Sequence, residues 1–99
     1  MAIIRKGADT PITLTNLSEA IEIKRVDFSQ DGKIVVTKTG EDFTIVGTTG
    51  YTELSQEETL KFDENFLVDI QLAFTISGKA RRTNIVNAYA VKSLYPKEI

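Results

Sequence analysis

Apolar and polar residues alternate over positions 66–76, and this period restricts the possible folds more than any other feature of the sequence. Every second residue there is large and apolar: Phe66, Val68, Ile70, Leu72, Phe74 and Ile76. Successive side chains of a β-strand point to opposite faces, so a strand turns a period of two into one continuous apolar face. We therefore expect a long strand that contributes this face to a core.

The composition extends this preference for strands to the rest of the chain. The 99 residues include 11 Ile, 7 Val and 12 Thr, whereas Leu and Ala together number 14. β-branched side chains pack well on a pleated sheet and lose rotamer freedom in a helix. The length is that of one domain, and no linker or repeat divides the chain. We expect a single all-β domain over residues 1–99.

Six further strands are predicted from short apolar stretches between turn residues. We place them at residues 10–15, 20–29, 33–39, 43–46, 51–54 and 81–92. Asp31-Gly32 predicts a type I′ hairpin turn, because both central residues of that turn need a positive φ. Pro11 cannot donate to a ladder, which indicates an edge strand or a strand that begins there.

Two local features refine this pattern. Ile21 and Ile23 have one parity and Val26 and Phe28 the other, so a bulge near residues 24–25 would bring all four to one face. Ser55 and Glu58 have the spacing of a capping box, in which each side chain satisfies the other's backbone amide. We expect a short helix at about residues 55–61 that carries the chain from one sheet to the other.

Together these elements predict an antiparallel β-sandwich resembling an immunoglobulin fold. It would have about seven strands, with the short helix before the sixth and the last two strands forming a long hairpin. The strand at residues 66–76 would be central. A small open β-barrel is the alternative architecture.

The residue types argue against several classes of function. The chain has neither Cys nor His, which removes the thiolate nucleophile, the commonest general base and the commonest metal ligands. No spacing of carboxylates suggests a catalytic pair, so we predict no enzyme, no catalytic, cofactor or metal residue and no small-molecule substrate. The net charge of −2 argues against nucleic acid, and no apolar run approaches membrane-spanning length.

Charge is distributed unevenly along the chain. Residues 41–70 hold eight acids and one lysine, a net charge of −7, whereas residues 71–99 hold five bases and one acid, a net charge of +4. Ordinary solvated surface charge is one interpretation. The other is that oppositely charged ends let copies meet head to tail, or bind an acidic neighbour. The candidate interaction surface comprises Lys79, Arg81, Arg82, Glu57 and Glu58.

Several stretches resemble small structural proteins of Firmicutes phages and prophages. The start, residues 4–7 and 10–14, resembles the N-terminal strand of small tail and baseplate proteins, although Ala8 separates Gly7 from Asp9 where baseplate proteins have Gly-Asp directly. Residues 54–62, Leu-Ser-Gln-Glu-Glu-Thr-Leu-Lys-Phe, resemble the most distinctive segment of the group. Residues 68–71 and 83–85 continue the similarity.

This resemblance implies a virion structural protein, similar in fold to the N-terminal domain of phage baseplate upper proteins. Its partners would be other virion proteins or further copies of itself, and it would be made in the cytoplasm of the host bacterium. The resemblance implies no catalytic residues. The alternative function is a module that binds host-surface glycans, for which Tyr51, Tyr89 and Tyr95 are the aromatic candidates.

Overall fold

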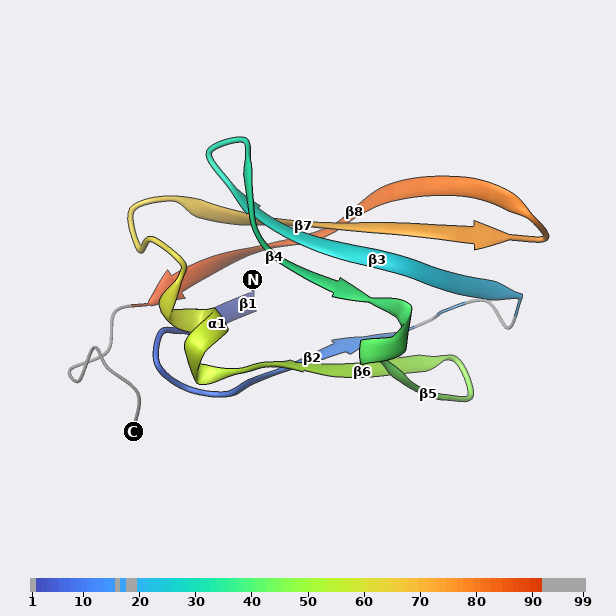
Figure 1. Cartoon of the computed structure of the whole chain (residues 1–99), viewed down its shortest axis with the longest axis horizontal. Coiled ribbons are helices and arrows are strands. Elements are labelled where there is room, and N and C mark those ends of the chain that lie inside the picture. Colours follow the sequence, from blue (N-terminus) through green and yellow to red (C-terminus); the bar gives the residue numbers. More distant parts are fainter. Residues whose placement is uncertain (1, 16, 18–19, 92–99) are drawn as a thin grey trace.

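A computed structural model shows a mostly antiparallel β protein with two sheets (Figure 1). It describes the backbone of residues 2–15, 17 and 20–91, and the side chains of residues 4–15, 17 and 20–82. The larger sheet has the order β1 (Ala2–Arg5), β8 (Lys79–Val91), β7 (Leu67–Ile76), β3 (Ile21–Gln30) and β4 (Lys33–Thr39). The smaller sheet has the order β2 (Thr10–Leu14), β6 (Thr49–Leu54) and β5 (Thr44–Val46).

The all-β prediction is confirmed, with one strand more than expected. β1 lies at the edge of the larger sheet and pairs in parallel with the far end of β8, where Ala2 lies opposite Ala88. Four residues are too few to show an alternating pattern, and the partner strand comes at the other end of the chain. Neither sheet closes into a barrel among the described strands. β2 is an edge strand, as Pro11 predicted.

β7 is the strand expected from the alternating apolar residues at positions 66–76, which we call the alternating stripe. It lies between β8 and β3 in the middle of its sheet. Val68, Ile70 and Leu72 are almost completely buried. The prediction is wrong for the first residue of the stripe, because Phe66 precedes the strand and is 44% exposed. Its backbone amide donates to the carbonyl of Asp63 at 3.4 Å. Residue 66 therefore closes a turn, where strand alternation does not apply.

The predicted bulge in β3 is confirmed and sets which face of the strand is buried. The pairing of β3 with β7 shifts register between Ile23 and Arg25. Ile23, Val26 and Phe28 are consequently buried together despite their different parity. The extra residue of a bulge reverses the alternation beyond it, and this brings both halves of β3 to the core.

Local turn chemistry also agrees with the sequence. Asp31 and Gly32, between β3 and β4, have φ values of 49° and 75°, as a type I′ turn requires. A 3₁₀ turn (η1, Gly40–Asp42) then carries the chain from β4 toward the smaller sheet. A side chain at Gly40 would collide with the backbone carbonyl of Ile23, so only glycine lets this turn approach β3 so closely.

The short helix α1 (Gln56–Leu60) connects β6 in the smaller sheet to β7 in the larger one, as predicted. Its capping box is complete: Ser55 Oγ accepts from the amide of Glu58 at 3.2 Å, and Glu58 Oε1 accepts from the amide of Ser55 at 3.0 Å. Thr59, which is fully buried, accepts a hydrogen bond from the amide of Gly7 at 2.9 Å. This bond ties α1 to the chain between β1 and β2.

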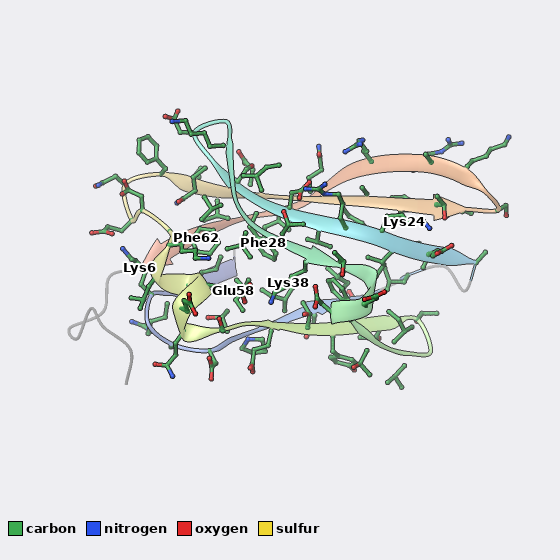
Figure 2. The ribbon with its side chains drawn as sticks, viewed as in Figure 1. Lys6, Lys24, Phe28, Lys38, Glu58 and Phe62 are labelled. Atoms are coloured by element: carbon green, nitrogen blue, oxygen red, sulfur yellow. The ribbon has the colours of Figure 1, made fainter. Side chains whose placement is uncertain are left out.

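The core lies between the two layers. Figure 2 shows Phe28 from the larger sheet beside Phe62, which follows α1. Their ring centroids are 6.4 Å apart with an interplanar angle of 68°, an edge-to-face contact. The buried apolar side chains of the described residues form one cluster, made of Ile4, Leu14, Ile23, Val26, Phe28, Val36, Phe43, Leu54, Phe62, Val68, Ile70 and Leu72.

Candidate interaction surfaces

The β7–β8 hairpin carries exposed positive charge at one end of the molecule. Lys79, Arg81 and Arg82 begin β8 and are all exposed. Within the described part of the chain none of the three contacts a carboxylate, and Arg81 Nη1 donates only to the carbonyl of Ala80 at 3.0 Å. The molecule is elongated, about 45 × 27 × 21 Å, and Figure 1 shows this hairpin tip at the end away from α1.

A hollow of about 500 Å³ lies beside this tip and brings in two further bases. Arg25 in β3 pairs with Ala73 in β7, which pairs with Arg82 in β8. Residues paired across a sheet share a face, so the two arginines flank a small side chain. Lys24 also lines the hollow. We call Lys24, Arg25, Lys79, Arg81 and Arg82 the basic end.

The two bases from β3 are partly neutralised by acids of the same strand. Lys24 Nζ lies 2.8 Å from Glu22 Oε1. Arg25 donates to Asp27 Oδ1 from both Nε and Nη2, at 2.9 and 2.7 Å. The unbalanced charge of the basic end therefore comes from β8. Lys24 and Arg25 were not among the residues predicted for this surface, although the bulge predicted at these two consecutive bases was a signal for it.

The structure gives Glu57 and Glu58 different environments. Glu57 is exposed on α1, whereas Glu58 Oε1 accepts hydrogen bonds from Lys38 Nζ at 2.7 Å and from the amide of Ser55 at 3.0 Å. Burial acts to raise the pKa of Glu58, but Lys38 and Ser55 together outweigh it and hold the pKa below its ordinary value. Glu58 thus fastens α1 to β4 and is not a free charge for a partner.

Two acids outside the prediction lie close to Glu57. Asp9 is exposed, and its Oδ1 accepts from the amide of Gln56 at 2.9 Å. Glu53, also exposed, pairs with Pro11 across β6 and β2, two residues along from Asp9. We call Asp9, Glu53 and Glu57 the acidic end, which lies with α1 at the opposite end of the molecule from the β7–β8 tip (Figure 1).

A second hollow, of about 570 Å³, opens between β3, η1 and β5. Ile21, Ile23 and Ile45 provide its apolar lining. The charged residues that line it are Glu22, Lys24 and Glu41. Ile45 and the neighbouring Val46 are 51% and 62% exposed. Together with Tyr51, these two residues are the exposed large apolar side chains of the smaller sheet among the described residues.

Of the three aromatic candidates for glycan binding, only Tyr51 has a described side chain. Tyr51 is 46% exposed on β6, whereas the side chain of Tyr89 and the whole of Tyr95 lie outside the described residues. The described residues contain no group of three or more His, Cys, Asp or Glu side chains placed to hold a metal ion. None of the helices that the structure describes has the length and apolarity needed to span a membrane.

Comparisons with known proteins found no relative: no family model, no curated protein and no solved structure matches this chain. A function must therefore be argued from the charged ends, the hollows and the sheet edges.

Proposed function

We propose that this protein is a structural component of a bacteriophage virion that acts through protein–protein contacts. It would be made in the cytoplasm of the host bacterium and incorporated into the tail, the baseplate or an accessory structure. The observation that carries the proposal is the position of exposed charge of opposite sign at the two ends of an elongated molecule, on side chains such as Arg82 and Glu57 that form no ion pair within the described part of the chain. Such charges steer partners together and fix their register.

The segment with the most distinctive resemblance to phage proteins has a structural role in this chain. Residues 54–62 end β6, form α1 and contribute Leu54, Thr59 and Phe62 to the interior. The same segment supplies the complete capping box and the ion pair with Lys38. The resemblance to phage proteins therefore concerns the segment that joins the two sheets. It supports the proposed class of protein and assigns no binding residue.

We also propose that the fold is an immunoglobulin-like sandwich, and the strand order supports this. Immunoglobulin domains place strands B, E and D in one sheet, and G, F and C, with C′ in variable domains, in the other. The order β2-β6-β5 corresponds to B-E-D, and β8-β7-β3-β4 corresponds to G-F-C-C′. β1 would then be a short first strand beside the last.

The proposed function is tested on particles from the bacterium that carries the gene. Phage particles released after prophage induction are purified by density gradient, and their proteins are identified by quantitative mass spectrometry. We expect this chain in a fixed ratio to the tail proteins, and antibody against it should label one part of the particle in electron micrographs. Absence from intact particles, with the chain abundant in the lysate, would contradict the proposal.

A glycan-binding module is the second candidate, because Tyr51 presents an exposed aromatic ring on β6. Apolar sugar faces stack on such rings, and one ring gives weak binding at best. A Tyr51→Ala variant and the unaltered protein would be compared on an array of bacterial cell-wall glycans. Binding that depends on Tyr51 would favour this function over purely structural contacts.

A further inference from the structure

We propose that the hollow beside the basic end binds the acidic end of a second copy of this chain, so that copies join head to tail. The inference rests on the proposed function and names the partner of one of its surfaces. It makes this chain a repeating unit of a ring or a filament.

The hollow has cationic side chains that can bind carboxylates. It opens on a sheet face where Ala73 and Ala80 leave room between larger side chains. Arg82 pairs with Ala73 and lines this face, and Arg81, which pairs with Phe74, borders the hollow from the neighbouring position. Neither arginine contacts a carboxylate among the described residues. A guanidinium group can hold a carboxylate through two parallel hydrogen bonds, and charge-assisted bonds of this kind are about twice as strong as neutral ones.

The acidic end offers the matching groups. Asp9, Glu53 and Glu57 are all exposed, and neither Glu53 nor Glu57 forms an ion pair within the described part of the chain. The capping box and the bond from Gln56 to Asp9 hold α1 in place, so Glu57 is presented by a fixed element.

The acidic end and the β7–β8 tip lie toward opposite ends of the elongated molecule, so they cannot meet within one copy. The net charge of −2 is small, and long-range repulsion between copies is correspondingly weak. The two surfaces differ, which makes the contact heterologous. Heterologous contacts continue from copy to copy until a ring closes or a filament forms.

Two double variants separate the surfaces: Arg81→Gln with Arg82→Gln at the basic end, and Glu53→Gln with Glu57→Gln at the acidic end. All four positions are exposed, so each variant should keep the circular dichroism spectrum and melting temperature of the unaltered protein. In sedimentation velocity at low salt, the unaltered protein should form oligomers that grow with concentration and dissociate with added salt. Each variant should weaken association at least about tenfold, which corresponds to roughly 1.4 kcal/mol.

Mixing the two variants gives the sharpest result. Each retains one intact end, so the mixture should contain one-to-one heterodimers and no larger species. Lys33→Gln and Glu41→Gln are the controls, because they remove one exposed base and one exposed acid outside both ends. Both control variants should assemble like the unaltered protein.

A protein that stays monomeric at every concentration, variants that associate normally, or a mixture without heterodimers would each overturn this inference. These outcomes are distinct from failure of the proposed function. A monomeric chain that is present in purified particles would leave the virion assignment standing and make another virion protein the partner. A chain that assembles head to tail but is absent from particles would have the opposite consequence.

Discussion

Glu57 and Glu58 are adjacent in α1, yet the fold gives them separate roles. Glu57 faces solvent, whereas Glu58 caps the helix and reaches Lys38 in β4. Figure 2 shows Glu58 and Lys38 close together between the two layers. The Lys38 and Glu58 side chains of this ion pair are only 13% and 24% exposed, so water screens the pair less than a surface pair.

Replacing Glu58 by Gln should therefore destabilise the fold, whereas Glu57→Gln should not. We expect a loss of about 1–2 kcal/mol for Glu58→Gln, because a helix cap is weakened and the mostly buried side chain of Lys38 loses its partner. Glu57→Gln should change the free energy of unfolding by less than about 0.5 kcal/mol. Urea unfolding followed by circular dichroism measures both. Equal losses would show that the Glu58 contacts contribute nothing beyond exposed charge.

The lowered pKa of Glu58 predicts a dependence of this stability on pH. The pKa of a glutamate side chain in the unfolded chain is about 4.5, and the pKa of Glu58 in the folded protein lies below it. A carboxyl group with a depressed folded pKa stabilises the folded state above the unfolded pKa, and this contribution is lost as pH falls through the folded pKa. The difference in melting temperature between the unaltered protein and Glu58→Gln should therefore narrow as the pH is lowered below about 4.5. A constant difference would contradict this.

Gln30 shows what residue-level analysis of the sequence did not find. Its buried amide donates to the carbonyls of Asp63 and Phe66, at 2.6 and 2.9 Å, and accepts from the amide of Asp63 at 2.8 Å. These bonds join the end of β3 to the turn before β7. A polar residue at the end of a strand is ordinary, and nothing in its neighbours indicates a partner 33 residues away.

At the scale of elements, the bulge in β3 decides which side chains enter the core. Ile21 and Ile23 are at odd positions, whereas Val26 and Phe28 are at even positions. The extra residue near position 24 brings these two pairs to the same face of the strand. The bulge also includes Lys24 and Arg25, which line the hollow of the basic end. One local irregularity thus serves both the core and the candidate surface.

Deleting Lys24 should be far more harmful than replacing it. The deletion removes the extra residue, so either Ile23 or the pair Val26 and Phe28 must turn to solvent. We expect the deleted protein to lose its cooperative thermal transition. Lys24→Ala keeps the bulge and removes only an exposed side chain, so its melting temperature should stay close to that of the unaltered protein. A deletion variant that unfolds cooperatively at the same temperature would mean that β3 can slip its register.

The alternating stripe illustrates how far an element can be predicted. Its middle is confirmed as the buried face of β7, because strand alternation follows from backbone geometry. Its first residue is exposed, because the turn at residues 63–66 displaces Phe66 from the strand. A phenylalanine outside the stripe, Phe62, is the one packed against Phe28.

At the scale of the whole molecule, Phe62 links the two layers and Phe66 does not. Phe62→Ala should destabilise the protein by about 3–5 kcal/mol, since it leaves a cavity against Phe28. Phe66→Ala removes a side chain that is 44% exposed and should cost about 1 kcal/mol or less. Chemical unfolding of the two variants gives the comparison. If Phe66→Ala were the more damaging change, the core would lie elsewhere than between the two sheets.

The candidate surface was predictable only in part. Lys79, Arg81 and Arg82 follow a Ser-Gly turn, and turn residues with positive φ place them at an exposed tip. The other two bases of this surface, Lys24 and Arg25, belong to β3, which is far from residues 79–82 in the sequence. The acidic end likewise joins Asp9 to residues of β6 and α1 through pairing and hydrogen bonds between distant segments.

The amino-acid sequence alone was sufficient to predict the all-β fold class, the hairpin turn at Asp31-Gly32, the capped helix and the bulge. These features depend on backbone geometry and on contacts between residues close in the chain. The pairing of β1 with β8 and the exposure of Phe66 are known from the tertiary structure alone. The same holds for the ion pair between Lys38 and Glu58 and for the hollow flanked by Arg25 and Arg82. These depend on which distant segments pair and pack, and many pairings are compatible with the same local pattern.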